Sequence, residues 1–175
     1  MTNPVEAALY DELLTAHYGE VLRLCRLLLG NHHEAEEVSQ DVFLKVFQEI
    51  QKVNQPKPMN WKPWIMKVSV NTCRDRRRSG WWKLWRVARD IVQEANHPIV
   101  PWTPEDALLS RELQGQIWRA FQQLSLRQRE VFVLRHVEEW STEEVANILG
   151  LTTGSVKRHL FRAVHRMQNI LGECP

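Results

Sequence analysis

Apolar residues recur every three or four positions from residue 5 to residue 50, which is the spacing of amphipathic helices. The first helix is expected over residues 5–29, with Gly19 as a point where it can break and Gly30 as its end. Asn31 can cap a second helix, because Glu34 stands three positions after it. The buried stripe of this second helix is expected to comprise Val38, Val42, Val46, Phe47 and Ile50. By default solvent covers its opposite face, which carries Glu36, Glu37, Gln40, Asp41 and Lys45.

Helical spacing returns in the last third of the chain. A helix is expected from Pro104 to about Leu124, because Thr103 can cap it and proline suits a first helical position. Its core-facing residues are expected to be Leu108, Leu109, Leu113, Ile117, Phe121 and Leu124. The next helix begins after Ser125, which has the pattern of a capping box with Gln128.

A helix-turn-helix is expected after that, because Ser141 and Glu144 repeat the capping box and Gly150 can end that helix as a left-handed residue. Thr152 can cap the helix that follows the turn. The apolar residues of this second helix are spaced four apart: Val156, Leu160 and Val164. The side chains that project elsewhere are those of Thr153, Ser155, Lys157, Arg158, Phe161 and Arg162. This helix has the shape and charge of a DNA-recognition helix.

Between these two helical regions lies a strongly basic segment. Residues 51–60 hold two prolines and are expected to form a loop. The packing residues of the helix that follows, over 61–78, are expected to be Trp61, Trp64, Ile65, Val68 and Cys73. Its positive charge comes from Lys62, Lys67, Arg74, Arg76, Arg77 and Arg78. Basic residues interleaved with aromatic ones suit a nucleic-acid strand, although the two tryptophans fit a core better than a stacking platform.

Residues 80–103 lack a clean apolar period and contain prolines near their end, which indicates a linker. We therefore expect an all-α fold of two small helical domains, residues 1–79 and 104–175, joined by this linker. The linker carries three tryptophans whose role the sequence leaves open, Trp81, Trp82 and Trp85.

The net charge of +2 hides an uneven distribution of charge along the chain. Residues 1–55 carry a net charge of −5, whereas residues 56–90 carry +8. A concentrated basic block suits a polyanion. An acidic block is repelled by DNA and is better placed against a protein, so the two blocks predict two different kinds of partner.

The three cysteines, Cys25, Cys73 and Cys174, are widely spaced and indicate neither a disulfide framework nor a zinc site. They fit reduced thiols in the cytosol, with Cys25 in the core. No apolar run has the length and the lack of charge that a signal peptide or a membrane span requires. We expect a soluble cytoplasmic protein without membrane insertion, metal or cofactor.

Three stretches carry a resemblance to a known family, and one of them is WKPWIMKVSVNTCRDRRR, which resembles its minus-ten region, with Asn71 and Asp75 at familiar places. The run LSLRQREVFVLRHVEEWSTEEVANILGLTTGSVKRHLFRA resembles the carboxy-terminal, promoter-reading domain of bacterial sigma factors of the sigma-70 family, extracytoplasmic-function group. The stretch EAEEVSQDVFLKVF is similar to the sigma helix that docks on the coiled-coil clamp of the largest subunit of RNA polymerase. The domain that housekeeping sigma factors carry between these two is missing, as is typical of the extracytoplasmic-function group.

The resemblance implies a protein that binds core RNA polymerase, at the largest-subunit clamp and at the flap, and confers promoter specificity without catalysis. The implied polymerase-binding residues are Glu36, Glu37, Gln40, Asp41 and, as an apolar anchor, Phe43. The implied minus-ten DNA contacts are Asn54, Lys57, Asn60, Trp61, Lys67, Asn71, Arg74, Arg77 and Arg78. The implied minus-thirty-five contacts are Thr153, Ser155, Lys157, Arg158, Phe161 and Arg162. Such proteins are commonly held inactive by an anti-sigma factor, which is often anchored in the membrane.

Two positions of the expected recognition helix depart from the family pattern. Arg158 stands where a small hydroxyl residue is common, and His159 stands where arginine is common. The exact promoter sequence therefore stays open.

Two other functional hypotheses remain. A stand-alone helix-turn-helix regulator would bind a twofold-symmetric duplex without polymerase and would use its first domain for dimerisation or ligand sensing. An enzyme is disfavoured, because the sequence shows no nucleophile–base pair, phosphate loop or zinc signature. His32 and His33 stand beside three glutamates, but adjacent histidines point in different directions on a helix and are more often plain surface than metal ligands.

Overall fold

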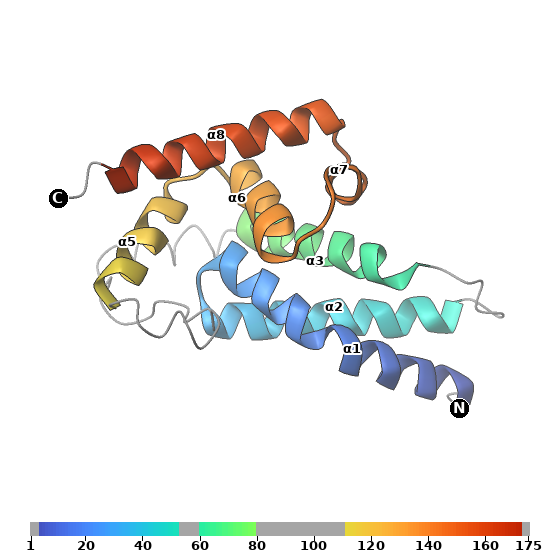
Figure 1. The fold of residues 1–175 in the computed structure, drawn as a ribbon. Helices are drawn as coiled ribbons and strands as arrows, with labels where there is room; N and C mark the ends of the chain where they lie inside the picture. Colours follow the sequence, from blue (N-terminus) through green and yellow to red (C-terminus); the bar gives the residue numbers. More distant parts are fainter. Residues whose placement is uncertain (1–3, 53–59, 80–110, 173–175) are drawn as a thin grey trace. The chain divides into compact units, whose positions relative to one another are not determined.

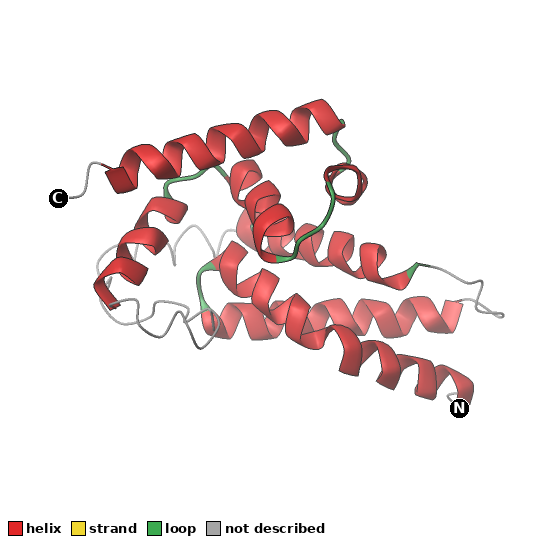
Figure 2. Ribbon diagram, viewed as in Figure 1, coloured by secondary structure: helices red, strands yellow, loops and turns green. Residues whose placement is uncertain are grey.

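The structure is a computed structural model that describes residues 4–52, 60–79 and 111–172. Within these ranges all secondary structure is helical and no strand occurs, so the all-α prediction is confirmed (Figure 2). The chain divides into two compact units, Met1–Asn96 and His97–Pro175. Each unit is described by itself below.

The predicted linker over residues 80–103, with its three tryptophans, lies outside the described residues. The predicted domain limits at residues 79 and 104 therefore stay predictions. Among the helices of the described ranges, none has both the length and the apolar character needed to cross a membrane.

Three helices build the first unit: α1 (Pro4–Leu29), α2 (His32–Lys52) and α3 (Trp61–Arg78), each of which packs against the other two (Figure 1). The break expected at Gly19 is wrong, because α1 continues through it. Packing against α2 and α3 outweighs the helix cost of a glycine, roughly 0.5–1 kcal/mol relative to alanine.

The turn between α1 and α2 forms as the sequence predicts. Gly30 is left-handed, with a φ of 70°, and its N–H donates to the Arg26 carbonyl at 2.8 Å. The Asn31 side chain caps α2, because its Oδ1 accepts from the Glu34 N–H at 2.9 Å. A left-handed glycine followed at once by a cap lets α2 run back along α1 (Figure 1).

The core of the first unit is an apolar layer shared by its three helices. The largest fully buried side chains are Val21, Leu24 and Leu28 of α1, Val38, Val42 and Val46 of α2, and Ile65, Met66 and Val70 of α3. Two free thiols belong to this core: Cys25 of α1 and Cys73 of α3 are both buried, with their Sγ atoms 3.6 Å apart. Cys25 is therefore a core residue, as expected, and the two thiols fill space between the helices.

A polar bridge also joins α2 to α3. The Lys45 ammonium donates to the Thr72 hydroxyl at 2.9 Å, and that hydroxyl donates to the Val68 carbonyl one turn back at 2.8 Å. The hydroxyl of Thr72 is thus fixed from both sides at the contact between the two helices.

The second unit comprises α5 (Arg111–Gln122), α6 (Leu126–Phe132), the π-helix η2 (Val133–Val137), α7 (Thr142–Leu149) and α8 (Thr153–Gly172). The long helix α8 packs against α5, α6 and α7 (Figure 1). Both predicted capping boxes are present, at Ser125 and at Ser141, and Gly150 is left-handed with a φ of 66°. The unit therefore ends in the predicted helix-turn-helix, α7–turn–α8.

Two details of the second unit differ from the prediction. Leu113, expected in the core, is exposed and Ile117 is only half-buried, whereas Phe121 and Leu124 are buried as expected. Leu108 and Leu109 lie outside the described residues. The helix after Ser125 does not stay α-helical but widens into η2, since the Glu138 N–H donates to the Val133 carbonyl, five residues back, at 3.0 Å. Spacing of apolar residues does not reveal such a change of helix type.

Candidate functional site

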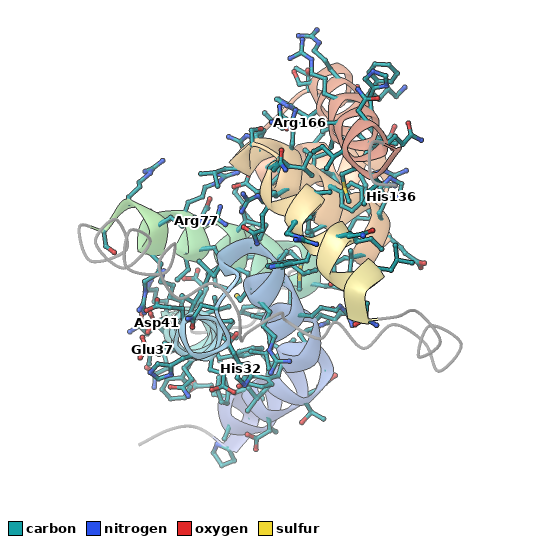
Figure 3. The ribbon with its side chains drawn as sticks, turned by 90° about the vertical axis from the view of Figure 1, so that its left-hand side faces the viewer. His32, Glu37, Asp41, Arg77, His136 and Arg166 are labelled. Carbon is teal, nitrogen blue, oxygen red and sulfur yellow. The ribbon has the colours of Figure 1, made fainter. Side chains whose placement is uncertain are left out.

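The predicted acidic face of α2 is at the surface. Gln40, Asp41 and Lys45 are exposed, and Glu36 and Glu37 are partly exposed. Figure 3 shows Glu37 and Asp41 together along one side of this helix.

Phe43, predicted as an apolar anchor for polymerase, is buried in the free chain. Its side chain is 2% exposed and packs against Tyr18 of α1, with ring centroids 5.8 Å apart. The next residue, Leu44, is the exposed apolar side chain of this face, at 54%. The sequence held part of the signal for this, because Phe43 stands three positions before Val46, which belongs to the expected buried stripe.

An apolar hollow of about 450 Å³ adjoins this face, between α1 and α2. Its lining residues are Tyr10, Leu14, Tyr18, Gln40, Phe43, Leu44 and Phe47. Tyr10 and Phe47 meet edge to face within it, with ring centroids 5.4 Å apart. Because Gln40 and Leu44 belong both to the hollow and to the face, the two form one continuous surface.

Arg76 of α3 does not project from the basic helix as a free cation. Its Nη1 lies 3.0 Å from Glu34 Oε2 and 2.8 Å from Glu37 Oε2, and its Nη2 lies 3.3 Å from Asp41 Oδ2. The hydrogen bond from Arg76 holds the pKa of Glu37 below its ordinary value, against a smaller opposing effect of burial. Burial would lower the pKa of Arg76, but its bond to Glu37 and the charges of Glu34 and Glu37 together raise it.

The other predicted basic residues of α3 form a surface of their own. Lys67, Asn71 and Arg78 are exposed and Arg74 is partly exposed, at spacings of four, three and four that place all four on one side of the helix. Arg74 Nη1 donates to Asn71 Oδ1 at 3.2 Å, so two of these residues are held together. Arg77 is partly exposed and lies farther round α3 (Figure 3).

The start of α3 is less basic than expected. Asn60 is exposed, whereas Trp61 is partly buried and meets Trp64 edge to face at 5.7 Å. Lys62 pairs with Glu20 of α1 at 3.0 Å. Asn54 and Lys57, which the sequence also assigns to DNA, lie outside the described residues.

The predicted recognition residues share the outer surface of α8. The exposed ones are Thr153, Lys157, Arg158, Phe161 and Arg162. Ser155 is partly buried and belongs to the helix cap, since the Thr152 hydroxyl accepts from its N–H at 3.1 Å and donates to its Oγ at 3.0 Å. Phe161 is 71% exposed and stacks on His165, with centroids 5.9 Å apart and planes 4° from parallel.

Arg127 of α6 is a positive charge near α8 that the sequence does not single out. Its Nη1 donates to the buried Glu130 at 3.0 Å. Burial, together with the charges of Arg127, Arg162 and Arg158, lowers the pKa of His159, and Glu130 opposes this. The charge of Arg127 therefore acts at the same place as two α8 arginines, and its pairing with Glu130 three residues on is the signal that could have found it.

No group of three metal-ligating side chains gathers within the described part of the chain. His32 and His33 instead pair with glutamates four residues on, at 3.1 Å to Glu36 and 3.4 Å to Glu37.

Two family descriptions match the chain: Sigma-70 region 2 over residues 13–83, and Sigma-70, region 4 over residues 114–167. The ECF RNA polymerase sigma factor SigL of Mycobacterium tuberculosis is 31% identical over 173 residues, which cover 96% of this chain and 92% of the relative. The chain belongs to the extracytoplasmic-function group of the sigma-70 family. SigW of Bacillus subtilis is 27% identical over 161 residues, 87% of this sigma factor and 83% of the relative. SigE of Mycolicibacterium smegmatis is 28% identical, but this sigma factor spans only 62% of its length.

Solved structures share the fold of this sigma factor. RpoE from Bartonella quintana, in complex with the anti-sigma factor NepR, matches with a TM-score of 0.69 and 23% identity over 95% of this chain and 98% of that one. CnrH, in complex with the cytosolic domain of CnrY, matches with a TM-score of 0.63 and 20% identity over 95% and 89% of the two chains. At this level of identity the likeness concerns the fold.

Proposed function

We propose that this sigma factor binds core RNA polymerase and directs initiation at specific promoters, in the cytoplasm and by binding rather than catalysis. The observation that carries this proposal is the separation of charge among three helices. One acidic surface lies on α2, and basic surfaces lie on α3 and α8. The acidic surface suits a basic protein partner, and the basic surfaces suit promoter DNA.

We assign polymerase binding to a docking face, defined as Glu36, Glu37, Gln40, Asp41 and Leu44 of α2. Leu44 takes the role that the sequence gave to Phe43, since it is the exposed apolar side chain among these acidic and amide residues. Such a face fits a helical partner whose basic side chains surround an apolar one. The hollow beside Leu44 extends the apolar part of the contact onto α1.

We assign minus-ten DNA to the basic side of α3. Lys67, Arg74 and Arg78 can neutralise the phosphates of a single strand, and the amide of Asn71, held by Arg74, can bond to a base edge. Asn60, Trp61 and Arg77 flank this surface. Asn54 and Lys57 of the preceding segment stay predictions.

We assign minus-thirty-five DNA to the outer side of α8. A recognition helix enters the major groove with its amino-terminal residues, which here are Thr153, Lys157 and Arg158. Phe161 and Arg162 follow one turn later, and Arg162 suits a guanine edge or a phosphate. Each good base contact contributes about 1–3 kcal/mol of discrimination.

Control by an anti-sigma factor is part of the proposal. The sigma factor RpoE, which shares this fold, was solved with the anti-sigma factor NepR, and CnrH, of the same fold, was solved with the cytosolic domain of CnrY. A partner that covers the docking face would keep this sigma factor from polymerase by simple competition.

The decisive experiment is a titration of the purified chain against bacterial core RNA polymerase, followed by transcription from a promoter library. We expect association with core and initiation confined to promoters that share two elements. A variant with Asp41→Lys should bind core more weakly while its circular-dichroism spectrum is unchanged. No association with core, together with tight binding of a twofold-symmetric duplex by the chain alone, would instead establish a stand-alone regulator.

A further inference from the structure

Two of the docking carboxylates already have a cation of their own chain. Glu37 and Asp41 each place an oxygen on the guanidinium of Arg76, at 2.8 Å and 3.3 Å. Arg76 comes from α3, so the pairing joins the helix proposed for polymerase to the helix proposed for DNA. A basic partner that approaches the docking face therefore meets carboxylates that are partly neutralised.

The three ion pairs of Arg76 differ in depth. The Glu34 side chain is only 12% exposed and anchors the guanidinium from below, whereas the side chains of Glu37 and Asp41 are 44% and 51% exposed. One positive charge faces three carboxylates, so the cluster keeps an excess of negative charge. The two outer pairs are therefore open to a competing cation, while the inner pair keeps Arg76 in place.

We propose that Arg76 is an internal competitor for the docking carboxylates Glu37 and Asp41, and that it lowers the affinity of the free sigma factor for its basic partner. This inference rests on the proposed role of the docking face in polymerase binding. A cation of the partner must share or displace Arg76 at both carboxylates before it gains their full charge. In this way Arg76 reduces non-specific binding of basic surfaces to the docking face.

The test compares core-polymerase affinity in variants that remove the internal cation. Arg76→Gln alone leaves the largely buried carboxylate of Glu34 without its cation, which destabilises the fold. A second variant, E34Q/R76Q, therefore removes both charges of the inner pair. Lys52→Gln is the matched control, because it removes one positive charge from α2 beyond the docking face, where Lys52 pairs only weakly with Glu49 at 3.3 Å. Circular dichroism and urea unfolding establish that each variant is folded.

We expect R76Q and E34Q/R76Q to bind core about two- to fivefold more tightly than wild type, which is the size that partly exposed ion pairs allow. K52Q should remain within about twofold of wild type. Asp41→Asn should weaken binding more in the R76Q background than in wild type, because Asp41 then no longer shares its charge. The gain should shrink as salt is raised.

Weaker or unchanged binding of both folded arginine variants would overturn the competitor role, and weaker binding would make Arg76 a residue that positions the carboxylates. If Asp41→Lys and Asp41→Asn leave core binding intact in wild type, the docking face itself is misassigned and both proposals fail. If they weaken it and R76Q does not tighten it, only the inference about Arg76 fails.

Discussion

Phe43 and Leu44 are neighbours in the sequence, yet they face opposite environments. Phe43 is 2% exposed and packs on Tyr18, whereas Leu44 is 54% exposed beside Gln40 and Asp41. On the same helix, Phe43 therefore serves the stability of the fold and Leu44 is available to bind a partner.

The first prediction uses this contrast. Phe43→Ala should lower the free energy of unfolding by about 3–5 kcal/mol, because it removes a buried ring. Leu44→Ala should change it by less than about 0.5 kcal/mol, because its side chain is largely in solvent, but should weaken binding to core polymerase several-fold. Urea unfolding gives the free energy of unfolding of each variant, and titration against core polymerase gives the binding affinity of each. Equal losses of stability in the two variants would contradict the assignment.

The second prediction concerns pH and His159. Burial and three nearby arginines hold its folded pKa below its ordinary value, so protonation favours the unfolded chain. The stability that depends on a neutral His159 should be complete above about pH 6.5, decline as the pH falls through that value, and level off below the folded pKa. NMR titration of the imidazole checks the pKa directly.

His159→Gln is the matched control for this effect. A neutral amide cannot titrate, so the variant should lose less stability than wild type between about pH 7 and pH 5. A His159 pKa above about 6.5 in the folded protein would contradict the prediction.

The third prediction separates promoter reading from polymerase binding. Arg162→Ala should weaken recognition of the minus-thirty-five element by about 1–3 kcal/mol, or roughly 5- to 150-fold, because it deletes a charged side chain from the outer side of α8. Gln168→Ala, at an exposed position farther along the same helix, is the control. Transcription from a promoter with both elements, with core affinity measured in parallel, gives the result. A matching fall in core affinity would show that the two functions are not divided in this way.

The fourth prediction concerns the turn of the helix-turn-helix. Gly150 has a φ of 66°, so Gly150→Ala should lower the free energy of unfolding by about 1–2 kcal/mol. Gly150→Asn should cost less, because asparagine tolerates the left-handed conformation better. Thermal unfolding of the two variants shows which of them loses more stability. There is open space around a Cβ at this position, so the backbone and not a clash decides the cost.

Local devices were predictable from the sequence because their residues are close together in it. Ser125, Ser141 and Asn31 each bond to a backbone N–H three positions on, and Gly30 and Gly150 each end a helix. The starts of α2, α6 and α7 and the ends of α1 and α7 follow from these contacts. The spacing on α8 was predictable in part, since Val156 of the expected apolar stripe is buried, whereas Leu160 and Val164 are only half-buried.

Tertiary relationships were not predictable in the same way. Arg76 looks like one basic residue among several, and only the packing of α3 on α2 brings it to carboxylates more than thirty positions away in the sequence. Phe43 stands at core spacing from Val46, but only the packing of α1 on α2 shows that Tyr18 covers it. Leu113 has the right spacing for the core, but α5 contacts its neighbours beyond it.

The two bridges between α2 and α3 have a mechanical consequence. Lys45 of α2 bonds to Thr72, and Arg76, one turn later on α3, keeps its inner pair with Glu34 of α2. Two fasteners a helical turn apart resist both sliding and rotation of one helix against the other, which a single contact does not. A protein that binds α2 therefore fixes the orientation of the basic side of α3 as well, because the two helices move together.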